Sequence, residues 1–333
     1  MKIHLLIASV DCNYVDHLSK VLTENYADVF EVSVCSTEES LTDSLGHRRV
    51  DIVLLGPEFA QNTGISQVRL PLFLWDETVA LDGQASEIKR IRKYQRISTL
   101  AGQILEQYAE ISSDNAGFDG GECGKITVVW SPTGGCGKTT AALSYAAQRV
   151  SEGKKAVYLN LEPFSSSPVY FPEGGKSISS VFEKLDGNVE LLLQSIRQID
   201  SGSGILYFCR PDNYDDIGIL TVDDMQRLVT SSAKDVDEVI VDLGNSFDQR
   251  IAMLMELANT VMVVIDHTRT AQVKWHQFCT QHSIYEKIKP KIMLVANRGA
   301  RIDQTQKVVS LPLVQSEDPV VVYKTLSAGY FSK

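Results

Sequence analysis

The segment Lys125–Thr140, KITVVWSPTGGCGKTT, places an apolar run directly before a glycine-rich turn, and an alanine-rich segment of helical character, Ala141–Val150, follows the turn. Glycines let backbone N–H groups approach phosphate oxygens, and a helix N-terminus adds the positive end of its dipole. Lys138 would supply a positive charge for the β- and γ-phosphates, and the hydroxyl of Thr139 a ligand for Mg²⁺. The segment therefore predicts a nucleotide site, whereas the plain alternative is a strand–turn–helix corner whose glycines only turn the chain.

The common phosphate-loop pattern has a glycine five residues before Gly137, where this chain has Pro132. Proline has no N–H, so one phosphate donor is missing. The candidate phosphate-binding residues are Thr133, Gly134, Gly135, Cys136, Gly137, Lys138, Thr139 and Thr140.

This loop resembles the deviant Walker A loop of the MinD/ParA ATPases, Lys-Gly-Gly-x-Gly-Lys-Thr. The resemblance implies ATP (or ADP) and Mg²⁺ as cofactors and a homodimer bridged by nucleotide. In that family the first lysine reaches across the dimer to the partner's phosphates, and Thr133 occupies its place here.

Composition limits the classes of protein that the chain can represent. Its 333 residues are enough for two domains, and 44% apolar with 22% charged residues is typical of globular proteins. No apolar run reaches transmembrane length and the N-terminus has no basic leader, so we expect a cytoplasmic protein. A net charge of −10 argues against a nucleic-acid partner, because nonspecific binding to DNA depends on a basic surface. The six cysteines are scattered, which indicates free thiols.

Residues 1–111 alternate strand and helix signals, which predicts a parallel α/β sheet. The expected strands are Ile3–Ala8, Phe30–Val34, Asp51–Leu55 and Leu72–Trp75. This half resembles a response-regulator receiver, whose phosphoacceptor aspartate follows the third strand. Gly56 stands there, and only Asp11 lies near the first strand as an acidic residue for Mg²⁺. We expect a pseudo-receiver that docks or dimerises, or else a generic α/β domain.

A single long helix is expected over Glu87–Glu110, and a basic cluster lies at its start. The small and polar residues after it are typical of a flexible linker. The predicted organisation is an atypical receiver-like (flavodoxin-like) domain over 1–111, a linker over 112–123 and a P-loop NTPase domain with a mostly parallel sheet over 124–333.

The strand expected near Lys155–Leu161 contains Asn160 and is followed by Glu162. MinD-like proteins carry Asp-x-Asp at these positions, and the second aspartate orients the attacking water. Glu162 could accept a proton or place water, which makes it a candidate catalytic residue; the alternative is a capping or solvated glutamate.

In the expected strand Glu238–Asp242, three apolar residues are followed directly by an aspartate. Ligands of open α/β sheets collect at the carboxyl ends of the strands. Asp242 resembles the Walker B aspartate, so it is the second metal candidate with Thr139, and the third catalytic candidate with Lys138 and Glu162.

Two further buried strands are expected at Thr260–Ile265 and Lys291–Ala296. Asn297 follows the second, where the family often has an asparagine that hydrogen-bonds adenine; a turn-capping asparagine is the alternative. A last strand and short helix are expected over Val308–Val314 and Pro319–Gly329. MinD binds membrane through a basic amphipathic tail. The sequence after Gly329 does not have this character, so we expect no direct membrane attachment through such a tail.

Taken over nearly the whole chain, the resemblance is to the TadZ/CpaE type, a pseudo-receiver fused to a MinD/ParA-like ATPase. That family localises at a cell pole and helps to place a tight-adherence pilus or secretion machine, so protein partners of such an assembly are expected. With Thr133 in place of lysine we expect slow or impaired hydrolysis. The rivals are a ParA-type DNA or cargo partitioning ATPase and a non-hydrolysing interaction scaffold. An iron–sulfur reductase of the nitrogenase iron-protein kind would carry its cluster cysteines beyond the strand that ends at Asp242. Asn245–Arg250 contains no cysteine, which disfavours this class.

Overall fold

The structure, a computed structural model, describes residues 2–27, 29–59, 62–76, 88–111, 123–182, 184–185, 188–300 and 308–331. Contacts divide the chain into two compact units, Met1–Gly120 and Gly121–Lys333. The linker expected over 112–123 lies, apart from Cys123, outside the described residues.

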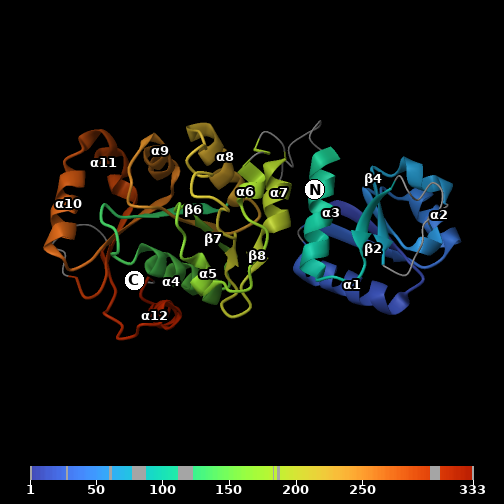
Figure 1. Ribbon diagram of the computed structural model, residues 1–333, viewed down its shortest axis with the longest axis horizontal. Helices are drawn as coiled ribbons and strands as arrows, with labels where there is room; N and C mark the ends of the chain where they lie inside the picture. The colour runs from blue at the N-terminus through green and yellow to red at the C-terminus, as the bar shows by residue number, and fades with distance from the viewer. Residues whose placement is uncertain are drawn as a thin grey trace. The chain divides into compact units, whose positions relative to one another are not determined.

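The first unit is an α/β domain around a parallel sheet (Figure 1). Its elements are β1 (Ile3–Ala8), α1 (Cys12–Asn25), β2 (Phe30–Cys35), α2 (Glu38–His47), β3 (Ile52–Leu55), two 3₁₀ turns (Pro57–Phe59 and Thr63–Gln67), β4 (Leu70–Trp75), β5 (Lys89–Arg92) and α3 (Ile97–Ile111). The strand order β2-β1-β3-β4-β5, with every described pair parallel, is the flavodoxin-like doubly wound order. The expected fold class is confirmed for this unit.

The expectation of one helix over Glu87–Glu110 is wrong. Residues 89–92 form the edge strand β5, and α3 begins only at Ile97. Ile91 pairs with Leu74 and is the one buried residue of the strand, while its neighbours Lys89, Arg90 and Arg92 are exposed. A short strand with a single inward residue has no periodicity of its own, and charged side chains are common on edge strands.

At the carboxyl edge of this sheet, charged side chains are already paired with one another. Lys93 Nζ lies 2.7 Å from Asp11 Oδ2, and this pairing lowers the pKa of Asp11. A Cβ at Gly56 would lie 2.5 Å from the carboxylate of Glu58, which accepts a hydrogen bond from the N–H of Val10. Gly56 therefore leaves the space that the Glu58 side chain fills.

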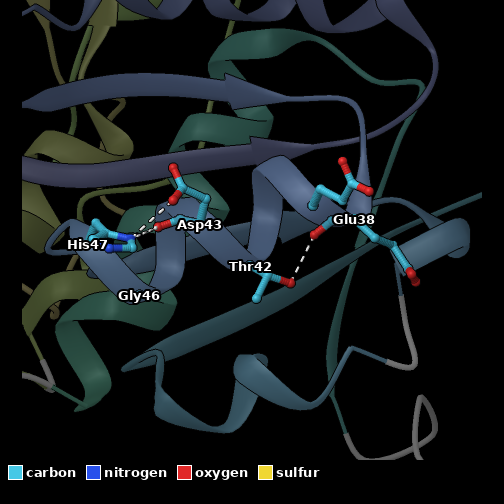
Figure 2. A pocket seen from close by; sticks show the side chains of 6 residues that line it. Glu38, Thr42, Asp43, Gly46 and His47 are labelled. Atoms are coloured by element: carbon cyan, nitrogen blue, oxygen red, sulfur yellow. Dashed lines mark hydrogen bonds and ion pairs between the residues drawn. The ribbon is translucent and has the colours of Figure 1, made fainter.

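An open surface hollow lies over α2 (Figure 2). It is lined by Glu38, Glu39, Thr42, Asp43, Gly46 and His47. His47 Nδ1 lies 3.1 Å from Asp43 Oδ1, and the hydroxyl of Thr42 donates to the carbonyl of Glu38. All six residues belong to one helix, and none is a residue that the sequence singles out for chemistry.

The second unit is larger and has helices on both faces of its sheet (Figure 1). Its elements are β6 (Lys125–Trp130), α4 (Lys138–Ser151), β7 (Ala156–Asn160), α5 (Ser167–Tyr170), α6 (Ser179–Phe182), α7 (Val189–Ile196), β8 (Gln198–Ile199), β9 (Leu206–Tyr207), α8 (Val222–Ser232), β10 (Glu238–Asp242), α9 (Gln249–Leu257), β11 (Thr260–Ile265), α10 (Arg269–Cys279), α11 (His282–Ile288), a 3₁₀ turn (Lys289–Lys291), β12 (Ile292–Ala296), β13 (Val308–Ser310) and α12 (Pro319–Leu326). The predicted strands at 260–265 and 291–296 and the final strand and helix are confirmed.

The strand order is β13-β12-β11-β6-β10-β7-β9-β8, and among the described pairs only β8–β9 is antiparallel. The mostly parallel sheet predicted for this half is confirmed. β6 lies between β10 and β11, and β7 lies on the far side of β10. Because parallel strands end at one edge, the segments that follow β6, β7, β10 and β12 meet there.

In the part of the chain that the structure describes, no helix combines the length and the apolar character needed to cross a bilayer.

Candidate nucleotide-binding site

The glycine-rich loop joins β6 to the N-terminus of α4. Gly135 and Gly137 have φ of 72° and 92°, in the left-handed region that favours glycine. Gly137 is the N-cap of α4 and gives it no side-chain cap. The positive end of this helix therefore faces the loop without a capping side chain, as an anion site requires.

Two buried side chains hold the loop against neighbouring strands. Asn297, at the end of β12, donates from Nδ2 to the carbonyl of Cys136 at 2.9 Å. A Cβ at Gly137 would come within 2.3 Å of that same nitrogen. Cys136 is buried, with Sγ 3.5 Å from the carbonyl of Val264, and burial raises its pKa. Glycine at 137 thus lets Asn297 reach the loop.

This contact bears on the role expected for Asn297. Its Nδ2 donates to the backbone carbonyl of Cys136, and its Oδ1 accepts from the N–H of Arg298. The geometry favours the turn-capping alternative, and an adenine contact stays a prediction.

Lys138, the first residue of α4, is nearly buried, with 7% of its side chain exposed. Its Nζ lies 3.6 Å from Oε1 of Glu162. Burial raises the pKa of Glu162, and the ammonium of Lys138 acts in the opposite direction. The carboxylate of Glu162 thus stands beside the cation that the sequence assigns to the phosphates.

Asp242, the last residue of β10, is fully buried. Its Oδ2 accepts from the hydroxyl of Thr139 at 2.7 Å, from the hydroxyl of Tyr158 at 2.8 Å and from Nδ2 of Asn160 at 3.2 Å. Its Oδ1 is buried and has no hydrogen-bond partner among the described residues. Burial and the nearby carboxylate of Glu162 raise the pKa of Asp242 to about 7, while the hydrogen bonds from Thr139 and Tyr158 act to lower it.

These residues fit a divalent cation. A buried polar atom without a partner costs about 1–3 kcal/mol, so the unpaired Oδ1 of Asp242 calls for a ligand. Carboxylate and hydroxyl oxygens are ligands that Mg²⁺ prefers. Thr139 and Asp242, which the sequence names together, are in direct contact.

The remaining residues of the loop are placed as follows. Gly134 and Gly135 are exposed, and Thr140 lies in the first turn of α4. The N–H of Thr133 donates to Oγ of Ser131, and its own hydroxyl oxygen is buried without a hydrogen-bond partner in the described part of the chain. Thr133 therefore brings no positive charge to the loop.

Sequence reasoning missed Tyr158 as a functional candidate. Tyr158 and Asn160 are two residues apart in β7, so their side chains point to the same face of the sheet. Asn160 is the register partner of Asp242. The available signal was a polar ring two residues before Asn160 in an otherwise apolar strand. It becomes informative only when β7 is known to lie beside β10.

Comparison with known proteins gives similar folds. No family model matches the chain, and no curated protein matches it. Similar solved structures include a ParA family ATPase from Chlorobium tepidum TLS, with a TM-score of 0.49 and 19% identity, over 61% of this chain and 90% of that one. A plasmid partition protein from Borrelia burgdorferi B31 bound to AMPPNP has a TM-score of 0.48 and 13% identity, over 62% and 90%. The septum site-determining protein MinD from Pyrococcus horikoshii OT3, complexed with Mg-ADP, has a TM-score of 0.47 and 14% identity, over 63% and 89%. Two of the three were solved with a nucleotide bound, AMPPNP or Mg-ADP, and all three TM-scores lie below 0.5, so function is inferred from the site itself.

Proposed function

We propose that the second unit binds ATP·Mg²⁺ and acts as a slow nucleotide-dependent switch of the MinD/ParA kind. The observation that carries this proposal is that Lys138, the Thr139 hydroxyl and the carboxylate of Asp242 lie together at the end of a glycine loop. One oxygen of that buried carboxylate has no hydrogen-bond partner among the described residues. Each of these groups matches one part of the triphosphate and its metal.

The residues divide the work by their chemistry. Backbone N–H groups of the loop and the start of α4 hold phosphate oxygens, and Lys138 adds a point charge. Thr139 and Asp242 would hold Mg²⁺, which neutralises charge on the phosphates when bound. Glu162 lies where a carboxylate can orient a water molecule or accept its proton.

Slow turnover is proposed from Thr133. A cation supplied to phosphoryl transfer by a finger residue is worth about 10³–10⁵ in rate. By resemblance, Thr133 occupies the position of such a lysine, and it carries no positive charge. Binding requires the loop amides and Lys138, so affinity is retained where turnover is low.

The biological role rests on the resemblance to TadZ/CpaE proteins. We propose a cytoplasmic homodimer that localises at a cell pole and helps to place a tight-adherence pilus or secretion machine. The first unit would be its docking module, since Gly56 cannot be phosphorylated and Asp11 is already paired with Lys93.

The test is a titration of the full chain with ATP, ADP and GTP, with and without Mg²⁺, while light scattering follows the mass of the particle. We expect tight binding of ATP and ADP that Mg²⁺ strengthens, weak binding of GTP, and a dimer with ATP. Absence of ATP binding would leave the interaction scaffold. Salt-dependent binding of DNA would favour a partitioning ATPase.

Glu162→Gln is expected to strengthen ATP·Mg²⁺ binding about tenfold, or about 1.4 kcal/mol, because the carboxylate 3.6 Å from Lys138 competes with phosphate for that ammonium. Glu190→Gln is the matched control, since Glu190 lies in α7, outside the loop, and pairs with Lys234 at 3.1 Å. Calorimetric titration measures both, and unchanged or weaker ATP affinity in Glu162→Gln contradicts the competition.

The same variant separates the two roles left open for Glu162. A proton acceptor predicts that turnover falls about 10²–10⁴-fold, whereas a capping residue predicts no fall. Single-turnover hydrolysis at saturating ATP distinguishes them.

A further inference from the structure

Three donors converge on one oxygen of Asp242. The hydroxyls of Thr139 and Tyr158 and the amide of Asn160 all reach Oδ2, at 2.7, 2.8 and 3.2 Å. Oδ1 accepts from none of the described groups and is buried. A carboxylate bonded so asymmetrically is fixed in rotation, with Oδ2 held by protein and Oδ1 left for another ligand.

Tyr158 is the least expected of the three. Its ring is fully buried in β7 and packs on Phe171, with ring centroids 5.8 Å apart. A rigid ring thus aims one O–H at Asp242.

A chain of hydrogen bonds runs through this hydroxyl. The N–H of Glu162 donates to Oδ1 of Asn160, Nδ2 of Asn160 donates to the hydroxyl of Tyr158 at 2.9 Å, and that hydroxyl donates to Asp242. The backbone that carries Glu162 and the carboxylate of Asp242 are therefore connected through two buried side chains. Such outer partners orient a metal ligand and tune its affinity.

We propose that Tyr158 is a positioning residue for the divalent cation, holding Oδ2 of Asp242 so that Oδ1 faces the metal. The inference rests on the proposed function, because it needs the cation that accompanies the nucleotide. It predicts that the affinity for the metal depends on Tyr158, whereas the affinity for nucleotide without metal does not.

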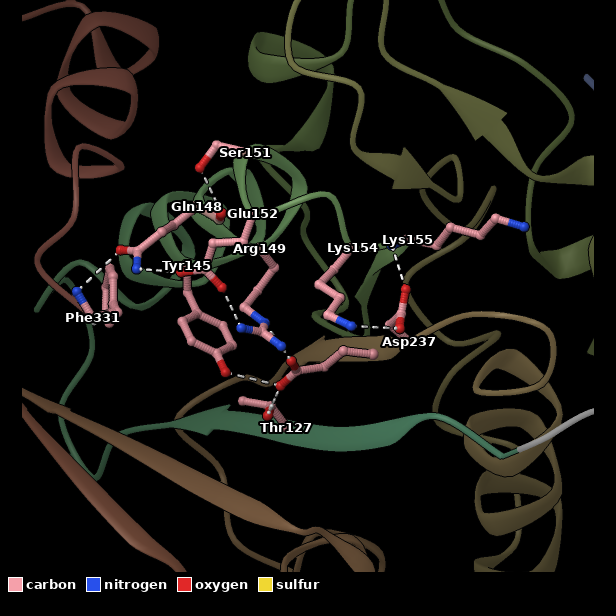
Figure 3. A network of polar contacts seen from close by, with 11 residues as sticks. Thr127, Tyr145, Gln148, Arg149, Ser151, Glu152, Lys154, Lys155, Asp237 and Phe331 are labelled. Atoms are coloured by element: carbon pink, nitrogen blue, oxygen red, sulfur yellow. Dashed lines mark hydrogen bonds and ion pairs between the residues drawn. The ribbon is translucent and has the colours of Figure 1, made fainter. Parts of the chain in front are cut away.

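The other end of β10 offers a matched control (Figure 3). There the buried carboxylate of Glu238 accepts from the hydroxyl of Thr127 at 2.5 Å, from the hydroxyl of Tyr145 at 3.0 Å and from Nε of Arg149 at 2.9 Å. Tyr145→Phe removes a phenol–carboxylate hydrogen bond from the same strand, away from the glycine loop. It therefore reports the cost of losing such a bond without touching the metal ligands.

The experiment measures Mn²⁺ binding to the full chain with ADP present, following free Mn²⁺ by electron paramagnetic resonance. Tyr158→Phe is expected to raise the Mn²⁺ dissociation constant about tenfold to a hundredfold. Binding of ADP in EDTA is expected to stay within about twofold of the wild type, because the outer partner acts on the metal. Tyr145→Phe is expected to lower the melting temperature and to leave both constants in place.

A folded Tyr158→Phe protein whose Mn²⁺ constant changes less than about threefold overturns the inference, since outer partners ordinarily count for more. Should that variant fail to fold, Asn160→Ala removes the amide that contacts both Tyr158 and Asp242, and the same threshold applies. A wild type that binds ADP no better with Mn²⁺ than without it fails the proposed function itself, which is a distinguishable result.

Discussion

Lys138→Ala is expected to weaken ATP·Mg²⁺ binding by at least about a hundredfold, or about 2.7 kcal/mol. Removing one partner of a buried charge pair costs about 2–5 kcal/mol, and Lys138 is 7% exposed. The loss has two sources. The phosphates lose their point charge, and the carboxylate of Glu162 stays in the site without its cation, where it repels them.

These two sources can be separated. Lys138→Ala combined with Glu162→Gln removes the stranded carboxylate, so the double variant is expected to bind ATP more tightly than Lys138→Ala alone. If Glu162→Gln changes ATP affinity by the same factor with and without Lys138, the two substitutions act independently, and Glu162 does not act through Lys138.

Lys234→Ala is the control for Lys138→Ala, because it breaks a lysine–glutamate pair of similar length, 3.1 Å, away from the loop. Affinity is measured by calorimetry, and folding by the melting temperature. If folded Lys138→Ala binds ATP within about threefold of the wild type, the loop is no triphosphate site, because a phosphate-bound ammonium contributes more than that.

The parts of the site that lie close together in sequence could be predicted from it. An apolar run, a glycine turn and a helix are local features, so the loop and Lys138 follow from residues 125–150 alone. Asp242 is predictable for a similar reason, because an apolar strand that ends in an aspartate is a pattern of only five residues. The contact between Asp242 and Thr139 follows once β6 and β10 are placed parallel and side by side, because the loop after β6 then lies next to the end of β10.

The parts that depend on strand order could not be predicted in this way. Tyr158 meets Asp242 only because β7 lies beside β10. Asn297 meets the carbonyl of Cys136, 161 positions earlier in sequence, because β12 and the loop share one edge of the sheet. The edge strand β5 was missed because Ile91 alone points inward and has no periodic partner.

Thr133→Lys is expected to raise ATP turnover, by at most about 10³–10⁵, the worth of a finger cation in phosphoryl transfer. The hydroxyl of Thr133 is buried and makes no hydrogen bond to the residues that the structure describes, so its removal gives up none of the described polar contacts. An unpaired ammonium is costly to bury; because Thr133 is half-buried and the adjacent Gly134 and Gly135 are exposed, we expect the lysine side chain to extend out of the loop.

Thr133→Met separates charge from length, because it adds a chain of comparable size without the cation. If the lysine reaches across a dimer, as the resemblance implies, the gain in turnover per chain rises with protein concentration until the dimer is saturated. If it serves its own phosphates, the gain is independent of concentration. Equal turnover in the lysine and methionine variants would mean that a missing cation at position 133 does not limit hydrolysis, and the cause of slow turnover would then lie with Glu162 and its pairing to Lys138.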